Sequence, residues 1–335
     1  MLNKKEFTYA DGAAVYLLAV LADLALQVLV AIVFNIVGTE YMQIDWVNII
    51  VSAFLQAAFI LCIFLYCRMK KTTPDFGFKK THPANYALAA AVALVSLVCF
   101  YCVAVAFDLL LQVTGYESGV GFEFTSLPAK ILGVLATCIA APIGEELIFR
   151  GALLSGLKKN FKTPIAVLLS GLAFSLMHMN PEQTVYQFLL GCALAYMTVT
   201  TGSVIPAMIG HAVSNLIAVL MEIAIPFGNA VNAAFDFLLS VPWLFAVLTV
   251  VLFAAGAAAV FFTGRFMEKL GGKRMERNFT SLPPSESEDK TGESEQSLLK
   301  KPMFGARAML IAGLAICAVL WISMLILGYV HIEGM

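Results

Sequence analysis

Charged residues are scarce in this chain: lysine, arginine, aspartate and glutamate make up only 13% of its 335 residues. A soluble globular domain usually carries about 25%. Hydrophobic residues reach 60%, and the mean hydropathy is +0.87. Short segments of alternating polarity, which are typical of a transmembrane β-barrel, are missing, whereas apolar runs of about 20 residues recur. The composition therefore predicts an all-α polytopic membrane protein.

Other absences narrow the range of functions. The net charge is −1, so no basic surface indicates a nucleic-acid partner. All seven cysteines lie in apolar runs, and the CxxC at Cys99 and Cys102 has no polar neighbours, which favours packing over redox or zinc chemistry. The polar N-terminus and the long apolar run after it are not typical of a cleaved signal peptide, so we expect the first span to act as the targeting signal.

The apolar runs predict nine membrane spans, near 13–37, 46–67, 84–112, 128–157, 164–180, 183–200, 203–225, 239–263 and 307–329. The first eight are expected to form a functional core within residues 1–264. Residues 265–306 are rich in serine and glutamate, include a proline pair, and are expected to be a disordered cytoplasmic linker. Residues 307–335 then form an extra C-terminal transmembrane helix, which we expect to be an appendage to the eight-helix core.

The distribution of positive charge predicts the orientation. Nineteen of the 21 lysines and arginines fall in the N-terminal segment and the loops after the second, fourth and eighth spans. The loops on the other side hold carboxylates but no lysine or arginine: Glu40, Asp45, Glu117, Glu123 and Asp236. Since positive charge marks the cytoplasmic side, we expect a cell-membrane protein with a cytoplasmic N-terminus and an extracytoplasmic C-terminus.

Three charges interrupt the fourth span in the stretch GEELIFRG, residues 144–151. Placing one ionised group at mid-membrane costs about 2.5–3.5 kcal/mol, so such groups normally face a bundle interior or a wet cavity. Glu146 and Arg150 are separated by one helical turn and are expected to pair. Glu145 points about 100° away from them and needs another partner. Asp23 and Gln27 in the first span share a face and are expected to turn toward the bundle or bond a neighbouring helix.

Two further polar sets lie in predicted spans. FSLMH in the fifth span ends on His178, and HAVSN in the seventh places His211 and Asn215 on one helix face. At 1.5 Å per helical residue, these side chains and Glu145 lie roughly 12–22 Å from the cytoplasmic ends of their helices. Three helices thus bring a carboxylate, two imidazoles and an amide to similar depths, within reach of a cavity that we expect to open to the cytoplasm.

This set has two chemical interpretations. Glu145 and His178 are suited to activate water as general base and acid, with His211 and Asn215 donating hydrogen bonds to an oxyanion. Alternatively, Glu145, His178 and His211 would bind a divalent metal such as zinc with an open fourth position. Both interpretations predict hydrolysis of an amide bond within the membrane. Glu146 and Arg150 are expected to support the site, although a purely structural pair is also consistent with the sequence.

These motifs resemble those of a known family. EELIFR matches the EExxxR motif of the CPBP intramembrane proteases, a group similar to the type II CAAX prenyl endopeptidases that includes bacteriocin-processing and immunity-related members. FSLMH and HAVSN match the family's FxxxH and HxxxN. The resemblance implies an eight-helix core with a conical cavity open to the cytoplasm and the membrane. It implies that Glu145 and His178 activate water, that Glu146 and Arg150 hold the site, and that His211 and Asn215 stabilise the oxyanion. The family has been described both as metalloproteases and as glutamate proteases.

Two other functions stay open at this point. A non-proteolytic scaffold or immunity protein would keep the fold and bind a partner, but it has no need of the whole Glu–His–His–Asn set. A proton- or cation-coupled transporter would use the buried carboxylates as ion sites, but the internal repeats typical of transporters are not evident. The motifs favour a protease that acts on membrane-associated or lipidated peptides or on membrane-protein segments.

Overall fold

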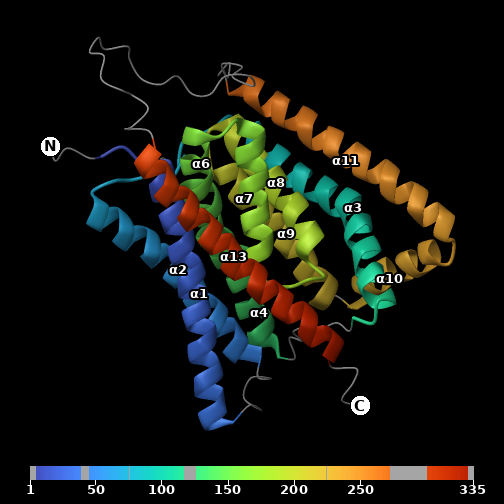
Figure 1. Ribbon diagram of the computed structural model, residues 1–335. Helices are drawn as coiled ribbons and strands as arrows, with labels where there is room; N and C mark the ends of the chain where they lie inside the picture. Colours follow the sequence, from blue (N-terminus) through green and yellow to red (C-terminus); the bar gives the residue numbers. More distant parts are fainter. Residues whose placement is uncertain are drawn as a thin grey trace.

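The computed structural model describes residues 5–38, 45–74, 76–116, 126–223, 225–271 and 300–330. Within these ranges the regular secondary structure is helical, apart from one isolated bridge between Lys5 and Thr72 (Figure 1). The chain is an all-α polytopic membrane protein, as the composition predicts. Its helices in order are α1 (Tyr9–Val37), α2 (Asp45–Lys70), α3 (Ala84–Val113), α4 (Leu127–Leu135), α5 (Ala141–Glu146), α6 (Leu154–Asn160), α7 (Thr163–Met177), α8 (Thr184–Thr201), α9 (Ile205–Ile223), α10 (Ile225–Leu239), α11 (Pro242–Leu270) and α13 (Lys300–Val330).

The structure does not confirm nine full membrane spans. In the part of the chain that it describes, six helices are long and apolar enough to cross a membrane, or seven if α9 and α10 form one bent span. The predicted span 164–180 corresponds to α7, which has only 15 residues. At 1.5 Å per residue α7 is about 22 Å long, which is shorter than a bilayer core of about 30 Å. The predicted span 183–200 corresponds to α8, which also falls outside the six.

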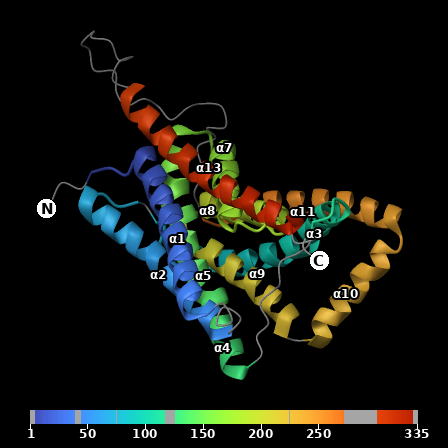
Figure 2. The same cartoon turned by 60° about the horizontal axis from the view of Figure 1, so that its bottom comes forward.

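A helix also replaces a predicted loop. Residues 226–238 were expected to connect two spans, but α10 covers them and runs from the end of α9 toward the start of α11 (Figure 2). The sequence IPFGNAVNAAFDFLL contains proline, glycine and two asparagines, which are typical of turns. In the structure this proline lies in the first turn of the helix, where a missing N–H costs little.

The fourth span is one long helix with two wide turns. Residues 127–160 run continuously through α4, α5 and α6, and π-helical stretches at Ala136–Ala140 and Leu147–Leu153 separate these three parts. Pro142 follows the first stretch, and a proline inside a helix removes one backbone hydrogen bond and crowds the preceding turn. π-Helical turns are rare and frequently occur at functional sites. Glu145 and Glu146 lie between the two stretches.

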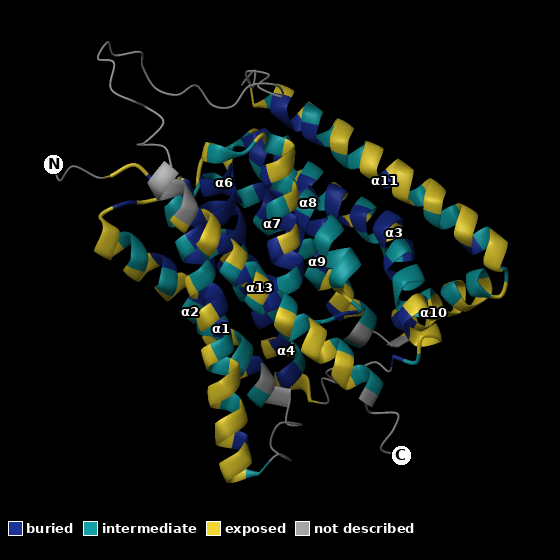
Figure 3. Cartoon of the chain, in the orientation of Figure 1, coloured by how far each residue is buried: buried dark blue, intermediate teal, exposed yellow. Residues whose placement is uncertain are grey.

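α7 and α8 pack closely at the centre of the bundle. A Cβ atom placed on Gly191 of α8 would lie 3.0 Å from the Cα of Gly171 on α7, so a larger residue would force the two helices apart. Exposed apolar residues are frequent on the surrounding helices, as Figure 3 shows along α11 and the C-terminal half of α1, and α7 also exposes Ile165, Leu168 and Leu172. In contrast, α8 has no exposed residue and is enclosed by its neighbours.

α13 packs on the core and is not a detached appendage. Ala306, Leu310 and Cys317 are buried in the main hydrophobic cluster of the protein together with residues of α1 and α7. The Tyr16 hydroxyl of α1 contacts the Cys317 sulfur at 3.7 Å. The predicted linker, 265–306, lies for residues 272–299 outside the described residues, so its predicted disorder stays a prediction.

Candidate active site

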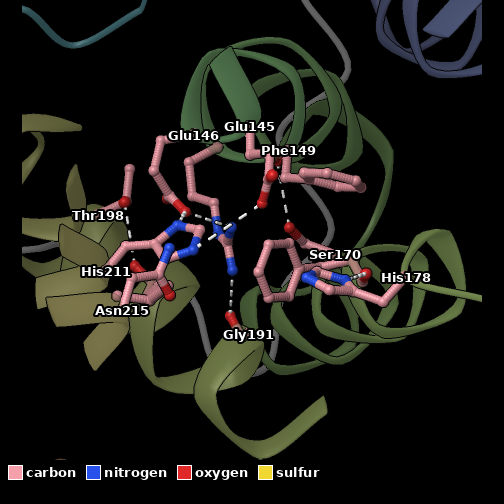
Figure 4. A network of polar contacts seen from close by, with 12 residues as sticks. Glu145, Glu146, Phe149, Ser170, His178, Gly191, Thr198, His211 and Asn215 are labelled. Carbon is pink, nitrogen blue, oxygen red and sulfur yellow. Dashed lines mark hydrogen bonds and ion pairs between the residues drawn. The ribbon is translucent and has the colours of Figure 1, made fainter. Parts of the chain in front are cut away.

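The predicted polar residues converge from three helical segments. Glu145 and Glu146 end α5, and Arg150 lies in the π-helical stretch that follows. His178 caps the C-terminal end of α7, and His211 and Asn215 project from α9 (Figure 4). The local sequence explains the grouping, since Glu146 and Arg150 share one face of their helix and His211 and Asn215 share one face of α9.

Glu146 and Arg150 form a fully buried ion pair. The Arg150 Nη1 atom donates to Glu146 Oε1 at 2.6 Å, and both side chains are 0% exposed. The Nη2 atom donates to the backbone oxygen of Gly191 on α8 at 2.9 Å. The guanidinium carbon also lies 4.5 Å from the centre of the Phe174 ring on α7. Arg150 therefore ties three helical segments together, which is a supporting role.

His211 lies between the two glutamates. Its Nδ1 atom is 2.9 Å from Glu146 Oε1, and its Nε2 atom is 3.8 Å from Glu145 Oε2. The imidazole is almost fully buried, and it also packs edge-to-face on Phe174 with ring centres 5.4 Å apart. His211 therefore links the two glutamates through its two ring nitrogens.

Glu145 presents one free carboxylate oxygen. Its Oε1 atom accepts a hydrogen bond from Gln56 Nε2 of α2 at 3.2 Å, whereas Oε2 has no hydrogen-bond partner. The neighbouring residue, Gly144, permits this contact, because a Cβ there would lie only 2.3 Å from Gln56 Oε1. One oxygen of Glu145 is thus held by Gln56, while the other is a buried acceptor that faces His211 Nε2 and forms no hydrogen bond.

The ring of His178 is oriented by its own helix. Its Nδ1 atom lies 2.8 Å from the backbone oxygen of Phe174, and the two rings pack edge-to-face with centres 4.7 Å apart. Since a carbonyl oxygen only accepts, we assign the proton of this contact to Nδ1. The Nε2 atom of His178 is then the nitrogen that is available for proton transfer.

Asn215 contacts the wide turn before Glu145. Its Nδ2 atom donates to the backbone oxygen of Thr137 at 2.8 Å. In this turn the N–H of Ala141 bonds the oxygen of Ala136, so the same register would pair Pro142 with Thr137. Proline has no N–H, and the amide of Asn215 supplies the missing donor. In this conformation Asn215 supports the helix that carries Glu145, whereas the sequence predicted an oxyanion donor.

A cavity of about 650 Å³ lies beside these residues. Of the six predicted site residues, Glu145 and His178 line it, while Glu146, Arg150, His211 and Asn215 do not. Its other polar walls include Asp23 and Gln56, to which sequence reasoning gave no chemical role. The sequence contains a feature that could have indicated each of them. Asp23 is a carboxylate inside the first span, and Gln56 follows Ser52 by one helical turn in an apolar run.

α13 also contributes to this cavity. Leu320, Ser323 and Met324 line it, opposite the helices that carry Glu145 and His178. The indole Nε1 of Trp321 donates to Thr184 Oγ1 at 2.6 Å, which ties α13 to the start of α8. The ninth predicted span is therefore a wall of the candidate active site.

The lining does not support the expected opening to the cytoplasm. The cavity is bordered by Tyr116, which follows α3, and by residues 179–182, which connect α7 to α8. In the predicted orientation both segments lie at the extracytoplasmic ends of their helices. Depth counted along single helices placed the polar groups at similar levels but did not show from which end they are reached.

The geometry does not fit the expected three-ligand zinc site. Among the described residues, no group of three or more His, Cys, Asp or Glu side chains is arranged to hold a metal ion. Both ring nitrogens of His211 face carboxylates, and Nδ1 of His178 faces a carbonyl oxygen. Glu145, His178 and His211 therefore do not converge as ligands on one point.

Comparison with known proteins identifies the segment that carries this site. Residues 127–217 match the family model of type II CAAX prenyl endopeptidase Rce1-like proteins. This segment of the chain is Rce1-like. The Rce1-like segment contains all six predicted site residues, which confirms the resemblance that the three motifs indicated, and the family is one of CAAX-type intramembrane proteases. No curated protein and no solved structure matches the chain.

Proposed function

We propose that this protein is an intramembrane endopeptidase that hydrolyses membrane-associated or lipidated peptides in the cavity lined by Glu145 and His178. The observation that carries the proposal is the position of these two side chains. They are the two predicted site residues that reach the cavity, and Glu145 Oε2 has no hydrogen-bond partner. The Rce1-like segment supports the same class of reaction.

The proposed chemistry uses water as the nucleophile. The Glu145 carboxylate accepts a proton from a water molecule, and the resulting hydroxide attacks the carbonyl carbon of the peptide bond. The Nε2 atom of His178 takes this proton from Glu145 and donates it to the leaving amine as the C–N bond of the tetrahedral intermediate breaks. Both side chains then return to their starting state, with a carboxylic acid and an amine as products.

The buried residues behind Glu145 are proposed to hold it in place. Gln56 orients one carboxylate oxygen, and the Nε2 atom of His211 lies 3.8 Å from the other. Glu146 and Arg150 in turn hold His211 and fix the helix against α7 and α8. This arrangement gives the second glutamate a positioning role, although the two glutamates are adjacent in the sequence.

The test is cleavage of quenched peptides, lipidated and unlipidated, by the full-length protein in liposomes. Glu145→Gln keeps the shape of the side chain but removes the base, so activity is expected to fall about 10²–10⁴-fold. Asp108→Asn is the matched control, because it removes a carboxylate of α3 that does not line the cavity. Equal cleavage by Glu145→Gln and wild type would refute the proposal.

A further inference from the structure

The basic residues mark one end of the helix bundle. The N-terminal ends of α1 and α13 and the C-terminal ends of α2, α6 and α11 lie together (Figure 1). These helix ends carry the lysines and arginines of the sequence, among them Arg68 and Lys70 on α2 and Lys158 and Lys159 on α6. The positive-inside rule makes this end cytoplasmic.

Several segments that line the cavity lie away from these helix ends. Tyr116 follows the last turn of α3, and Asn180, Pro181 and Glu182 connect α7 to α8. Ser52 lies in the first half of α2, and α2 runs toward the basic end. These three segments place the cavity away from the basic loops.

α13 gives an independent indication. It starts at the basic end and finishes at the other, and its cavity-lining residues, Leu320, Ser323 and Met324, lie in its second half. The preceding part of the helix instead packs in the protein core, where Ala306 and Leu310 are buried and Cys317 is fully buried against α1 and α7. The core-packed part of α13 therefore lies on the basic side, and the part that borders the cavity lies beyond it.

The charge of the cavity wall agrees with this assignment. Asp23, Glu145 and Glu182 line it, and within the described part of the chain no lysine or arginine does. The positive charge that gathers at cytoplasmic loops is therefore missing from the walls of the cavity.

From these positions we propose that the catalytic cavity is entered from the extracytoplasmic side of the membrane. The substrates are then peptide segments that reach the site from that side, such as exported peptides or the outer ends of membrane-spanning segments. That peptide substrates use this entrance rests on the proposed function. The direction from which the cavity is reached depends only on the fold and the orientation in the membrane.

Cysteine labelling in whole cells tests the direction of access. A single cysteine is introduced in the full chain at Ser323→Cys, on the cavity wall, or at Lys70→Cys, an exposed position at the basic end. Each variant is treated with a membrane-impermeant maleimide before and after permeabilisation, with wild type as the baseline for the native cysteines. Ser52→Cys, on a different wall, replaces Ser323→Cys if that variant fails to fold.

The expected result is labelling of the cavity cysteine in intact cells and of Lys70→Cys only after permeabilisation. Labelling of the cavity cysteine only after permeabilisation, or at neither stage, would overturn the inference. Labelling of both positions in intact cells would also overturn it, because the basic end would then be outside. The measurement does not require catalysis, so its failure is distinguishable from failure of the proposed protease activity.

Discussion

The role of Asn215 leads to a prediction that separates support of the helix from stabilisation of an oxyanion. Asn215→Leu removes the donor to the Thr137 oxygen and keeps an apolar side chain of similar size. A buried carbonyl left without a partner costs about 1–3 kcal/mol. Hydrogen bonds between membrane helices measure about 0.6–1.7 kcal/mol. We therefore expect a loss of about 1–2 kcal/mol in the free energy of unfolding.

Pro142→Ala supplies the second half of the test. Alanine restores a backbone N–H whose partner, in the register of the wide turn, is the oxygen of Thr137. In Asn215→Leu this substitution is expected to recover about 1 kcal/mol. The single variant Pro142→Ala measures any separate effect of removing proline, so the four proteins form a double-mutant cycle.

The assay is equilibrium unfolding of the purified proteins in mixed micelles, with peptide cleavage measured on the same samples. A supporting role predicts that stability and activity fall together in Asn215→Leu and recover together when Pro142→Ala is added. An oxyanion donor predicts a loss of about 10²–10³ in kcat that Pro142→Ala does not repair. Additive effects of the two substitutions on the free energy of unfolding would show that the N–H restored by Pro142→Ala does not replace the Asn215 donor. That result would refute the supporting role.

Three further substitutions follow from the site. Arg150→Met leaves Glu146 without its cation and is expected to cost about 3–5 kcal/mol in unfolding experiments; the double variant with Glu146→Gln is expected to lose less than the two single losses combined. Gly144→Ala places a Cβ 2.3 Å from the amide oxygen of Gln56 on α2. Gln56 must then shift away from Glu145, and cleavage is expected to fall at least about tenfold. Met324→Ala enlarges the cavity and is expected to shift kcat/KM about tenfold toward peptides with larger side chains, unlike Ile326→Ala on the exposed face of α13.

Each of these has an outcome that contradicts it. Unchanged stability of Arg150→Met would show that the buried pair contributes nothing to the fold. Gly305→Ala is the control for Gly144→Ala, since a Cβ at residue 305 meets nothing within 4 Å, and equal activity of the two variants would refute the steric argument. Equal selectivity changes in Met324→Ala and Ile326→Ala would remove α13 from substrate recognition.

The sequence by itself determined the fold class, indicated the family and singled out candidate site residues. Scarce charge and long apolar runs required helices in a membrane, because lipid leaves every backbone polar group to be satisfied within the chain. The spacing of Glu146 and Arg150 predicted their ion pair, because residues four apart meet on a helix face. The order of the three motifs indicated the family that residues 127–217 match.

Only the tertiary structure decided which of these side chains reach the cavity and from which end it is lined. Glu145 and Glu146 are adjacent in the sequence, yet one borders the cavity and the other lies at 0% exposure behind it. The packing of α7, α8 and α9 around the wide turns sets that difference, because contacts between helices fix how each helix is rotated. The same holds for α13, whose place in the cavity wall depends on contacts across more than 100 residues of sequence, such as Trp321 with Thr184. Hydropathy is a local property and carries no record of such contacts, so it predicted where most of the helices are, but not α10 and not what the helices enclose.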